Sequence, residues 1–392
     1  RTVFASFVLI VSTALAQGAS LTLSCLDVGR AVAACREAAA RFADETGNTV
    51  RVVSANPAGR EALENYRALL AVRSTRLDVI QFPDAWAPAL APDLLPLPIG
   101  DNADDFIAAA TQGARVEGIG VGLPHHLAIM VMLLRSDVVG DGVNLWSQLR
   151  ERLLTAPGDG ASGLAFGAAE PALFPFFLDW VYGLGGTDLA DRQSVRVALA
   201  MLGDLIGPVA VPGITRARAG DAIDGFVEGR NAALVARSTR AAAVDRDELE
   251  ATVFATLPQV DGGPETAPVL ATVWFLGVPR SSAAPEEARA LARFLASEDA
   301  QRSAAVNFGL APTRHALFDE EAVRGAGPIL AEIATVKEAI TAAPVERYGL
   351  AYLDLSDQVS EVVRELLRGE RDAETATSAI LRAVRRAERQ EN

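Results

Sequence analysis

Strand-like and helix-like segments alternate in the first part of the chain, and this alternation constrains the fold more than any other feature. Aliphatic or β-branched runs lie at residues 21–24, 50–54 and 77–82, and two stretches with helical spacing, about 30–46 and 59–73, separate them. Strands that alternate with helices of about 10–15 residues indicate parallel β-α-β units. The sequence therefore predicts an α/β domain here.

A second signal lies in the middle of the chain, where a glycine- and proline-rich break at 118–124 precedes an apolar strand at 127–134. Such a break inside an extended run indicates a chain that crosses between lobes, and a return strand is expected near 269–278. The chain has 392 residues, 50% of them hydrophobic, and one core rarely grows so large. We therefore predict two interleaved α/β lobes joined by hinge strands. Lobe 1 comprises residues 17–124 with about 275–330, and lobe 2 comprises residues 125–274 with about 331–392.

Helices are expected to dominate the remaining sequence, with clear signals at their ends. An aromatic-rich helix is predicted from Glu170 to Tyr182, where Gly183 ends it. Pro285 is expected to begin a helix, because proline is favoured in the first helical turn. Ser297 and Asp372 are predicted to cap later helices through their side-chain oxygens.

The charge of the chain argues against nucleic acid as a partner. The formal net charge is −14 at pH 7, whereas phosphate contacts require a basic surface. A short arginine run at 382–389 lies at the end of an amphipathic helix, where positive charge complements the helix dipole.

The N-terminus predicts export. Residues 3–16 form a largely apolar run without acids, Arg1 precedes it, and Ala14-Leu15-Ala16 fits a signal peptidase site. The run is short for a membrane span. We expect residues 1–16 to be a signal peptide cleaved near Ala16, which would leave a soluble periplasmic protein without membrane insertion. The alternative is a buried N-terminal strand or helix.

Two cysteines, Cys25 and Cys35, lie close together in the sequence. In an oxidising compartment such a pair favours one local disulfide, and the alternative is two free buried thiols. Nearby histidine and cysteine ligands are too few for zinc, so no metal site is predicted.

No enzyme signature stands in the sequence, and no cofactor is predicted. The G-x-S-x-G, H-E-x-x-H, Walker and G-x-G-x-x-G motifs are absent in the required contexts. Glycines at 118–122 precede a proline and a strand, which is the wrong context for binding phosphate. His125 and His126 should point to opposite sides of an extended strand, which makes them a poor metal pair.

Several stretches follow one another in an order that carries family information. They are Ser24-Cys25 with Val28-Gly29 and Cys35, FADETGNTV at 42–50, Asp78-Val79-Ile80-Gln81 with Asp84 and Trp86, FVEGRNAA at 226–233, and Ala292-Arg293-Phe294-Leu295 with Gln301 and Gly309-Leu310-Ala311-Pro312-Thr313. Together they resemble family 1 extracellular solute-binding proteins of ABC importers, the maltose-binding-protein-like type, and within it the trehalose, maltose and α-glucoside binders. The resemblance runs from about Leu21 to the last helix.

The resemblance implies a Venus-flytrap mechanism. Two lobes joined by hinge strands close around one ligand, and the closed form docks on a membrane permease. The expected partners are a small solute, most simply a sugar, and the permease subunits, and the protein is expected to be a monomer. A periplasmic adaptor or sensor partner with the same fold, and no import role, is the alternative.

Sugar binders use flat aromatic faces together with fixed charged and amide groups. By their positions Asp84, Trp86, Glu170 and Trp274 are predicted to contact the ligand. Asp84 could instead cap a helix, and Trp274 could belong to the core.

The sequence departs from the resembling family at positions expected to reach the ligand. His125 and His126 stand where two aromatic residues are expected, Arg237 and Arg240 lie near a replaced Trp-Pro-Tyr, and Arg347 follows Ala-Pro in place of Arg-Pro. Two hypotheses remain open. Either these side chains cover a remodelled cleft for a neutral sugar, or they bind a smaller or anionic solute.

Overall fold

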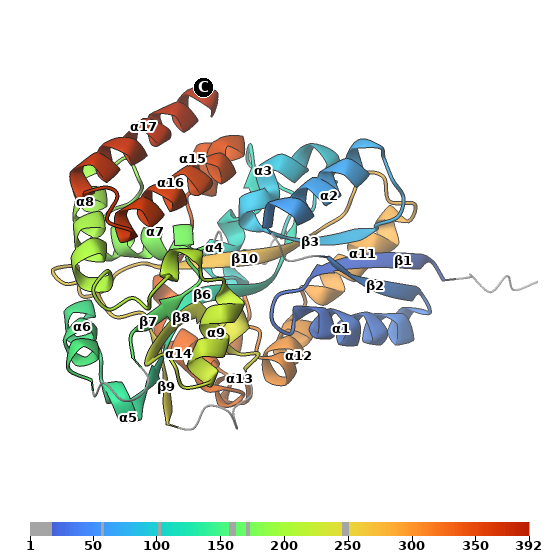
Figure 1. Ribbon diagram of the computed structural model, residues 1–392. Coiled ribbons are helices and arrows are strands. Elements are labelled where there is room, and N and C mark those ends of the chain that lie inside the picture. The colour runs from blue at the N-terminus through green and yellow to red at the C-terminus, as the bar shows by residue number, and fades with distance from the viewer. Residues whose placement is uncertain are drawn as a thin grey trace, which may run out of the picture.

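The computed structural model describes residues 18–55, 59–100, 103–156, 162–169, 173–244 and 251–391 (Figure 1). The predicted signal peptide (residues 1–16) and the candidate ligand residue Glu170 lie outside these ranges. Among the described residues, no helix combines the length and apolar composition that a bilayer crossing requires.

One mixed sheet runs through the molecule. In spatial order its strands are β2 (Thr49–Ala55), β1 (Ser20–Leu26), β3 (Val79–Pro83), β10 (Val269–Gly277), β6 (Leu123–Arg135), β8 (Ala233–Arg237) and β7 (Leu164–Phe166). Two further strands lie off this path, with β11 (Ile340–Ala342) pairing with β10 and β9 (Thr252–Thr256) pairing with β6. β1 pairs in parallel with β2 and β3, across helices α1 (Ala31–Thr46) and α2 (Gly59–Ala71). The predicted β-α-β units are therefore present.

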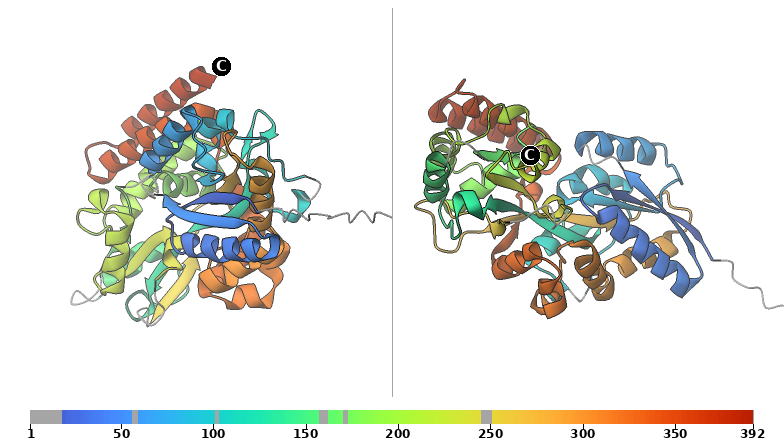
Figure 2. Two further views of the ribbon diagram at one scale, coloured as in Figure 1. Left: turned by 90° about the vertical axis from the view of Figure 1, so that its right-hand side faces the viewer. Right: turned by 60° about the horizontal axis from the view of Figure 1, so that its bottom comes forward.

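Helices cover the sheet in two groups, which define two lobes. In the β1–β3 lobe, α1 and α11 (Pro285–Leu295) pack on one face of the strands, and α2 with α3 (Ala87–Leu90) packs on the other. In the β7–β8 lobe, the aromatic helix α7 (Leu173–Gly183) packs with α8 (Arg192–Met201), α16 (Tyr352–Leu367) and α17 (Ala373–Glu391). The right-hand view of Figure 2 shows the two groups on opposite sides of the long strands.

The remaining helices are shorter or lie beside these two groups. They are α4 (Ala108–Gln112), α5 (Ser136–Val139), α6 (Trp146–Thr155), α9 (Ala219–Val227), α10 (Ser238–Ala241), α12 (Glu298–Phe308), α13 (Glu321–Gly325), α14 (Pro328–Val336) and α15 (Val345–Tyr348). A small separate hairpin consists of β4 (Arg115–Val116) and β5 (Ile119–Gly120).

The predicted helix caps and helix ends are confirmed. Gly47 ends α1 with φ of 73°, a conformation that favours glycine because it has no Cβ. The Ser297 hydroxyl accepts a hydrogen bond from the Ala300 N–H at 3.3 Å, which caps α12. Asp372 accepts one from the Thr375 N–H at 2.7 Å before α17.

Strands β6 and β10 connect the two lobes. β6 pairs with β10 from Leu123 to Ile129, then with β8 and β9 from Met130 to Arg135, so one strand of 13 residues belongs to both lobes. The predicted crossing is present. The predicted restart of the strand at residue 127 is wrong, since the strand begins at Leu123 and includes Pro124. Proline is tolerated close to the start of a strand, where a lost ladder hydrogen bond matters least.

A β-bulge interrupts the pairing of β6 with β10. Trp274 pairs with His126, whereas Phe275 pairs with Pro124, so His125 is an extra residue in β6. The Gln301 side chain donates a hydrogen bond to the Pro124 carbonyl at 3.2 Å, which fixes the backbone at this point. Bulges change the direction in which neighbouring side chains point, and this one lies next to the candidate site.

The predicted disulfide is confirmed. Cys25 at the end of β1 bonds Cys35 in α1, and both residues are buried. The bond ties the first strand of the sheet to the helix that packs on it.

Candidate functional site

A cavity of about 200 Å³ lies between the two lobes. The β1–β3 lobe contributes the end of β1 and the turn that follows β3, and the β7–β8 lobe contributes the ends of β8, α7 and α16. Strands β6 and β10 form the floor between them. Its lining includes the charged, hydroxyl-bearing and aromatic side chains of Asp84, Trp86, Phe174, Arg237, Arg240, Thr272, Trp274 and Tyr352. The structure thus brings together five of the predicted ligand residues.

Asp84 is the first residue after β3, where α/β folds place ligand-contacting loops. Its side chain is 3% exposed, and its Oδ1 accepts a hydrogen bond from the Ala85 N–H at 2.8 Å. Its Oδ2 is buried without a hydrogen-bond partner among the described residues. Burial raises the pKa of Asp84 to about 7, against the opposing effects of the Ala85 backbone hydrogen bond, the Arg237 charge and the Val273 backbone. A ligand hydroxyl would supply the missing partner.

Two arginines face the cavity from the β7–β8 lobe. Arg237 ends β8, and Arg240 lies in the one-turn helix α10 that follows. Burial lowers the pKa of Arg237, Asp84 raises it, and the like charge of Arg240 lowers it further, so the three charged groups lie close together. Arg237 donates a hydrogen bond to the Thr272 hydroxyl of β10.

Two tryptophans form apolar walls of the cavity. The Trp274 indole stacks on the His126 imidazole, with ring centroids 4.7 Å apart and an interplanar angle of 9°. Trp86 meets Tyr66 edge to face, with centroids 6.2 Å apart. Because His126 covers one face of Trp274, a ligand can stack only on the opposite face.

His125 and His126 do not line the cavity; both are buried behind it. The expectation that they point to opposite sides is wrong, because the bulge turns both rings together and their Nδ1 atoms lie 3.0 Å apart. The Leu26 N–H donates to Gln81 Oε1 at 2.9 Å, so Gln81 Nε2 donates to His125 Nδ1 at 2.8 Å. The Nε2 of His126 is buried without a partner among the described residues. Burial lowers the pKa of His125 to about 4 and that of His126 well below its usual range.

Arg347 lies outside the cavity. It belongs to α15 and forms ion pairs with Asp188 and, at 2.8 Å, with Glu388 near the end of α17. Its guanidinium also lies 5.6 Å from the centre of the Tyr348 ring. This arginine connects helices within the β7–β8 lobe.

Three cavity residues were not anticipated from the sequence. Tyr352 begins α16, is 4% exposed, and meets Phe174 edge to face with centroids 5.6 Å apart. Thr272 holds Arg237 from β10. An aromatic residue at the first position of an amphipathic helix is a signal that could have indicated Tyr352. Nothing in the local sequence marks Phe174 or Thr272, since each reaches the cavity only through the packing of distant elements.

The two-lobed geometry and its interlobe cavity agree with a match to a known family. The family model for the bacterial extracellular solute-binding proteins matches residues 37–327. This chain belongs to that family. The resemblance predicted from the sequence motifs is thereby confirmed, and the family consists of binding proteins.

Individual relatives of this solute-binding protein agree with the assignment. A probable ABC transporter-binding protein of Deinococcus radiodurans is 25% identical over 379 residues, which cover 90% of each chain. The maltose-bound T. maritima MalE3 has a similar structure, with a TM-score of 0.82, 22% identity, and coverage of 94% of this chain and 99% of that one. A solute-binding protein of Agrobacterium radiobacter K84 in complex with ribitol has a TM-score of 0.77 at 18% identity, with coverage of 95% and 99%. The predicted two-lobed binding-protein fold is confirmed.

Proposed function

We propose that this solute-binding protein serves an ABC importer, capturing a carbohydrate or carbohydrate-like solute in the interlobe cavity and delivering it to the membrane permease. One observation carries the proposal. The cavity is lined by both lobes, and it contains a buried carboxyl with an unpartnered oxygen, Asp84 Oδ2. A solute hydroxyl that bonds this oxygen while the rest of the solute contacts Arg237 and Tyr352 joins the two lobes. Contacts available only with both lobes in place shift the population toward the closed form.

The chemistry of the cavity supports a polyhydroxylated solute. Sugars present hydroxyl pairs to charged side chains and apolar ring faces to aromatic ones, and Asp84, Arg237 and Trp274 supply both kinds of contact. The cavity of about 200 Å³ is smaller than the roughly 300–1,000 Å³ that suits drug-sized ligands, which favours a solute of monosaccharide or polyol size. The relatives with bound maltose and ribitol bracket this range of solutes.

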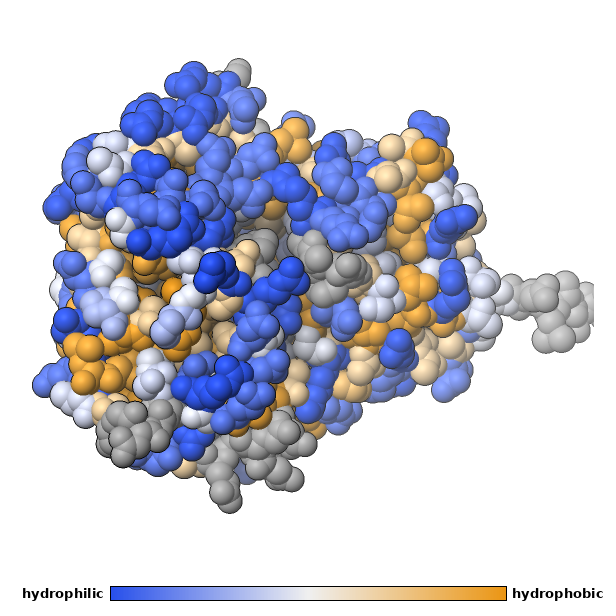
Figure 3. All heavy atoms as spheres, viewed as in Figure 1, coloured by the Kyte–Doolittle hydropathy of each residue, from blue (hydrophilic) through white to orange (hydrophobic). Residues whose placement is uncertain are grey.

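The proposal includes a periplasmic location, a monomeric state and permease subunits as the docking partner. It also keeps the predicted division of lobes, in which residues 17–124 and about 275–330 form one lobe. On the face shown in Figure 3, hydrophilic side chains cover the C-terminal helices, and hydrophobic side chains surface in a recess below them.

A thermal-shift screen of the chain from residue 17 tests the function. The panel contains maltose, trehalose, glucose, ribitol and mannitol, together with the acids named below. A solute at about 100 times its Kd adds about 2.7 kcal/mol of stability, so the melting temperature should rise by a few degrees. Trp274→Ala should abolish the shift, whereas the same change at the buried Trp146 of α6, outside the cavity, should lower the melting temperature without removing the response. A panel without any shift contradicts the proposal.

A further inference from the structure

The cavity has more positive than negative charge. The charged side chains that line it are one carboxyl, Asp84, and two guanidiniums, Arg237 and Arg240. Within the described ranges, neither arginine lies at ion-pair distance from a carboxylate, although the charges of Asp84 and Asp179 act on Arg237, and the only side-chain hydrogen bond of the two joins Arg237 to Thr272. Arg237 is half-buried and Arg240 is half-buried beside it. Positive groups withdrawn from water are normally paired, since an uncompensated charge costs several kcal/mol in a poorly solvated site.

The spacing of the two arginines prepares them to act together. Arg237 is the extended residue before the one-turn helix α10, Arg240 lies within that helix, and both side chains line the same cavity. Like charges at this spacing repel each other unless an anion lies between them. A guanidinium presents five N–H donors in a planar fork that matches a carboxylate in two-bond geometry. Thr272 occupies only one nitrogen of Arg237, so most of these donors stay open.

We propose that the solute is a sugar acid or related polyhydroxylated carboxylate, whose carboxylate binds between Arg237 and Arg240 while one of its hydroxyls donates to Asp84 Oδ2. This inference rests on the proposed function. The apolar face of the solute lies against the open face of Trp274. Each open group of the cavity then has a partner: the acid for the two guanidiniums, the hydroxyl for the orphaned oxygen, and the ring or carbon chain for the indole.

The balance of charge favours a carboxylate over a phosphate ester. A carboxylate adds one negative charge beside the two guanidiniums, Asp84 and the nearby buried carboxyl of Asp179, whose charge also acts on Arg237. A phosphate ester carries about −1.5 to −2 at pH 7, which would place excess negative charge beside the Asp84 carboxyl. A uronate or an aldonate also fits the small cavity, because it adds only a carboxylate to a monosaccharide skeleton.

Isothermal titration of the chain from residue 17 tests the inference with matched pairs: D-glucuronate against D-glucose, D-galacturonate against D-galactose, and D-gluconate against D-glucitol. D-glucose 6-phosphate is the phosphate comparison. At least one acid should bind about 10- to 100-fold tighter than its neutral counterpart, as expected for charge-assisted hydrogen bonds. Arg240→Gln should remove that advantage, and Arg240→Lys should restore part of it, because lysine keeps the charge without the planar fork. Arg293→Gln, on the exposed face of α11, is the matched control and should change nothing.

The outcomes separate the two proposals. If a neutral sugar binds as tightly as its acid and Arg240→Gln leaves both affinities unchanged, the inference is overturned and the carbohydrate-binding function stands. Tighter binding of glucose 6-phosphate than of any carboxylate also overturns it. If neither acids nor neutral compounds bind, both proposals fail together. Circular dichroism of each variant confirms folding, and Arg240→Lys provides a test even where Arg240→Gln is unstable.

Discussion

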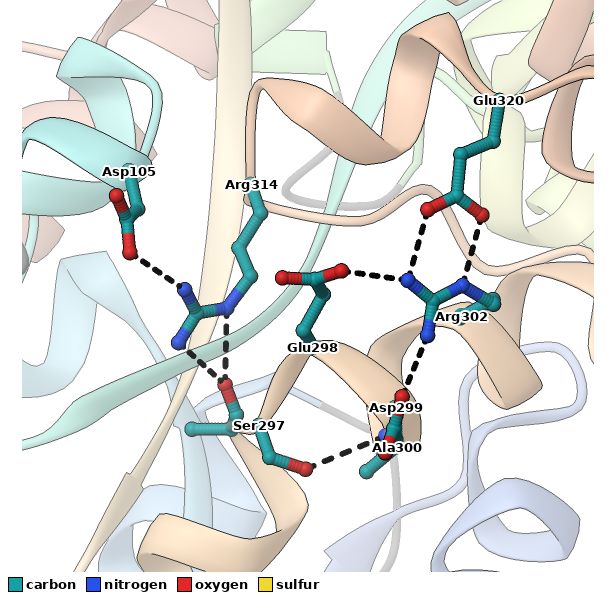
Figure 4. A network of polar contacts seen from close by, with 9 residues as sticks. Asp105, Ser297, Glu298, Asp299, Ala300, Arg302, Arg314 and Glu320 are labelled. Atoms are coloured by element: carbon teal, nitrogen blue, oxygen red, sulfur yellow. Dashed lines mark hydrogen bonds and ion pairs between the residues drawn. The ribbon is translucent and has the colours of Figure 1, made fainter.

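Two groups of arginines in this molecule have opposite surroundings. Around α12, Arg302 bonds both oxygens of Glu320 at 2.7 Å and also contacts Glu298 and Asp299 at 2.5 Å (Figure 4). Figure 4 also shows Arg314 bonded to Asp105, and the same guanidinium lies 4.2 Å from the centre of the Phe106 ring. Arg237 and Arg240 in the interlobe cavity form no hydrogen bond or ion pair with a carboxylate within the described part of the chain, although the charges of Asp84 and Asp179 act on Arg237.

The difference shows where polar side chains find their hydrogen-bond partners within the protein and where they do not. At the surface, nearby acids on the same helix and on a neighbouring segment accept hydrogen bonds from all three nitrogens of Arg302. In the cavity, donors and an acceptor stay open although opening them destabilises the folded protein. A site that keeps unsatisfied polar groups in a fixed arrangement is prepared for a partner that supplies the missing bonds.

The largest expected effect is on the pH dependence of the free energy of unfolding, which should differ between buried and surface acids. Burial raises the pKa of Asp84 to about 7 from 3.8, so the folded ligand-free protein binds this proton more tightly than the unfolded chain does. The stability that the protonated acid contributes is fully present below pH 3.8 and is lost as the pH rises through 7. Between pH 3.8 and 7 the Asp84 carboxyl should lower the free energy of unfolding by about 4 kcal/mol, and Asp84→Asn should abolish this decrease. Urea unfolding at each pH measures it.

Surface acids provide the control for this measurement. Hydrogen bonds from Arg302 lower the pKa of Glu320, so its contribution to stability is present above its unfolded pKa and is lost as the pH falls. Glu320→Gln should thus change the profile only at the acidic end. A second buried acid, Asp179, has a pKa raised to about 8, so Asp84→Asn should flatten the profile without abolishing its slope. An unchanged slope in Asp84→Asn would show that this carboxyl is solvated in the free protein.

The disulfide should separate stability from binding. Replacing Cys25 and Cys35 with alanine removes a crosslink with a sequence separation of 10 residues, which on the loop-entropy model costs about 3 kcal/mol. Neither cysteine lines the cavity, so solute affinity should stay within experimental error. Chemical denaturation and titration calorimetry of the same sample test both statements. A large loss of affinity would contradict this expectation and would show that the disulfide holds the end of β1 in the position that solute binding requires.

His126 is expected to act on the solute only through Trp274. His126→Ala removes the ring that covers one indole face and should lower solute affinity about 2- to 10-fold, by analogy with aromatic pair energies of roughly 0.5–1.5 kcal/mol. His126→Phe keeps a flat ring and should retain most of the affinity. Calorimetry with the tightest solute from the matched pairs, alongside Trp fluorescence of the free variants, measures the effect. Equal affinity losses in both variants would contradict a stacking role.

The smallest effect is expected for the saturated surface group. Arg302→Gln should lower the free energy of unfolding by less than about 1 kcal/mol, because exposed ion pairs are weak and screened by salt. The difference should shrink in 0.5 M NaCl, and solute affinity should not change. Urea unfolding at low and high salt measures it. If the substitution weakened solute binding, the contrast between the two arginine groups would break down.

Local sequence signals were sufficient for much of the fold. Alternating strands and helices predicted the parallel units around β1, and glycine, proline and cap residues placed the ends of α1, α11 and α12 correctly. These features depend on interactions between residues close together in the chain, so they can be read from a single sequence. The return strand β10 was also foreseen, within one residue at its end.

The residues of the candidate site also differ in whether local sequence or contacts between distant segments place them. Asp84 and Trp86 follow a strand end, and Arg237 and Arg240 lie where the sequence departs from the resembling family, so the sequence alone identified them as candidates. The orientation of the histidines depended on a bulge whose register is set by β10, more than a hundred residues away. Likewise, only the packing of α7 and α16 brought Phe174 and Tyr352 to the cavity. The sequence by itself proposed candidate side chains near strand ends and at departures from the resembling family. The tertiary structure decided which of them meet and added residues that the sequence did not indicate, because pairing between distant strands and helices selects the direction of each side chain.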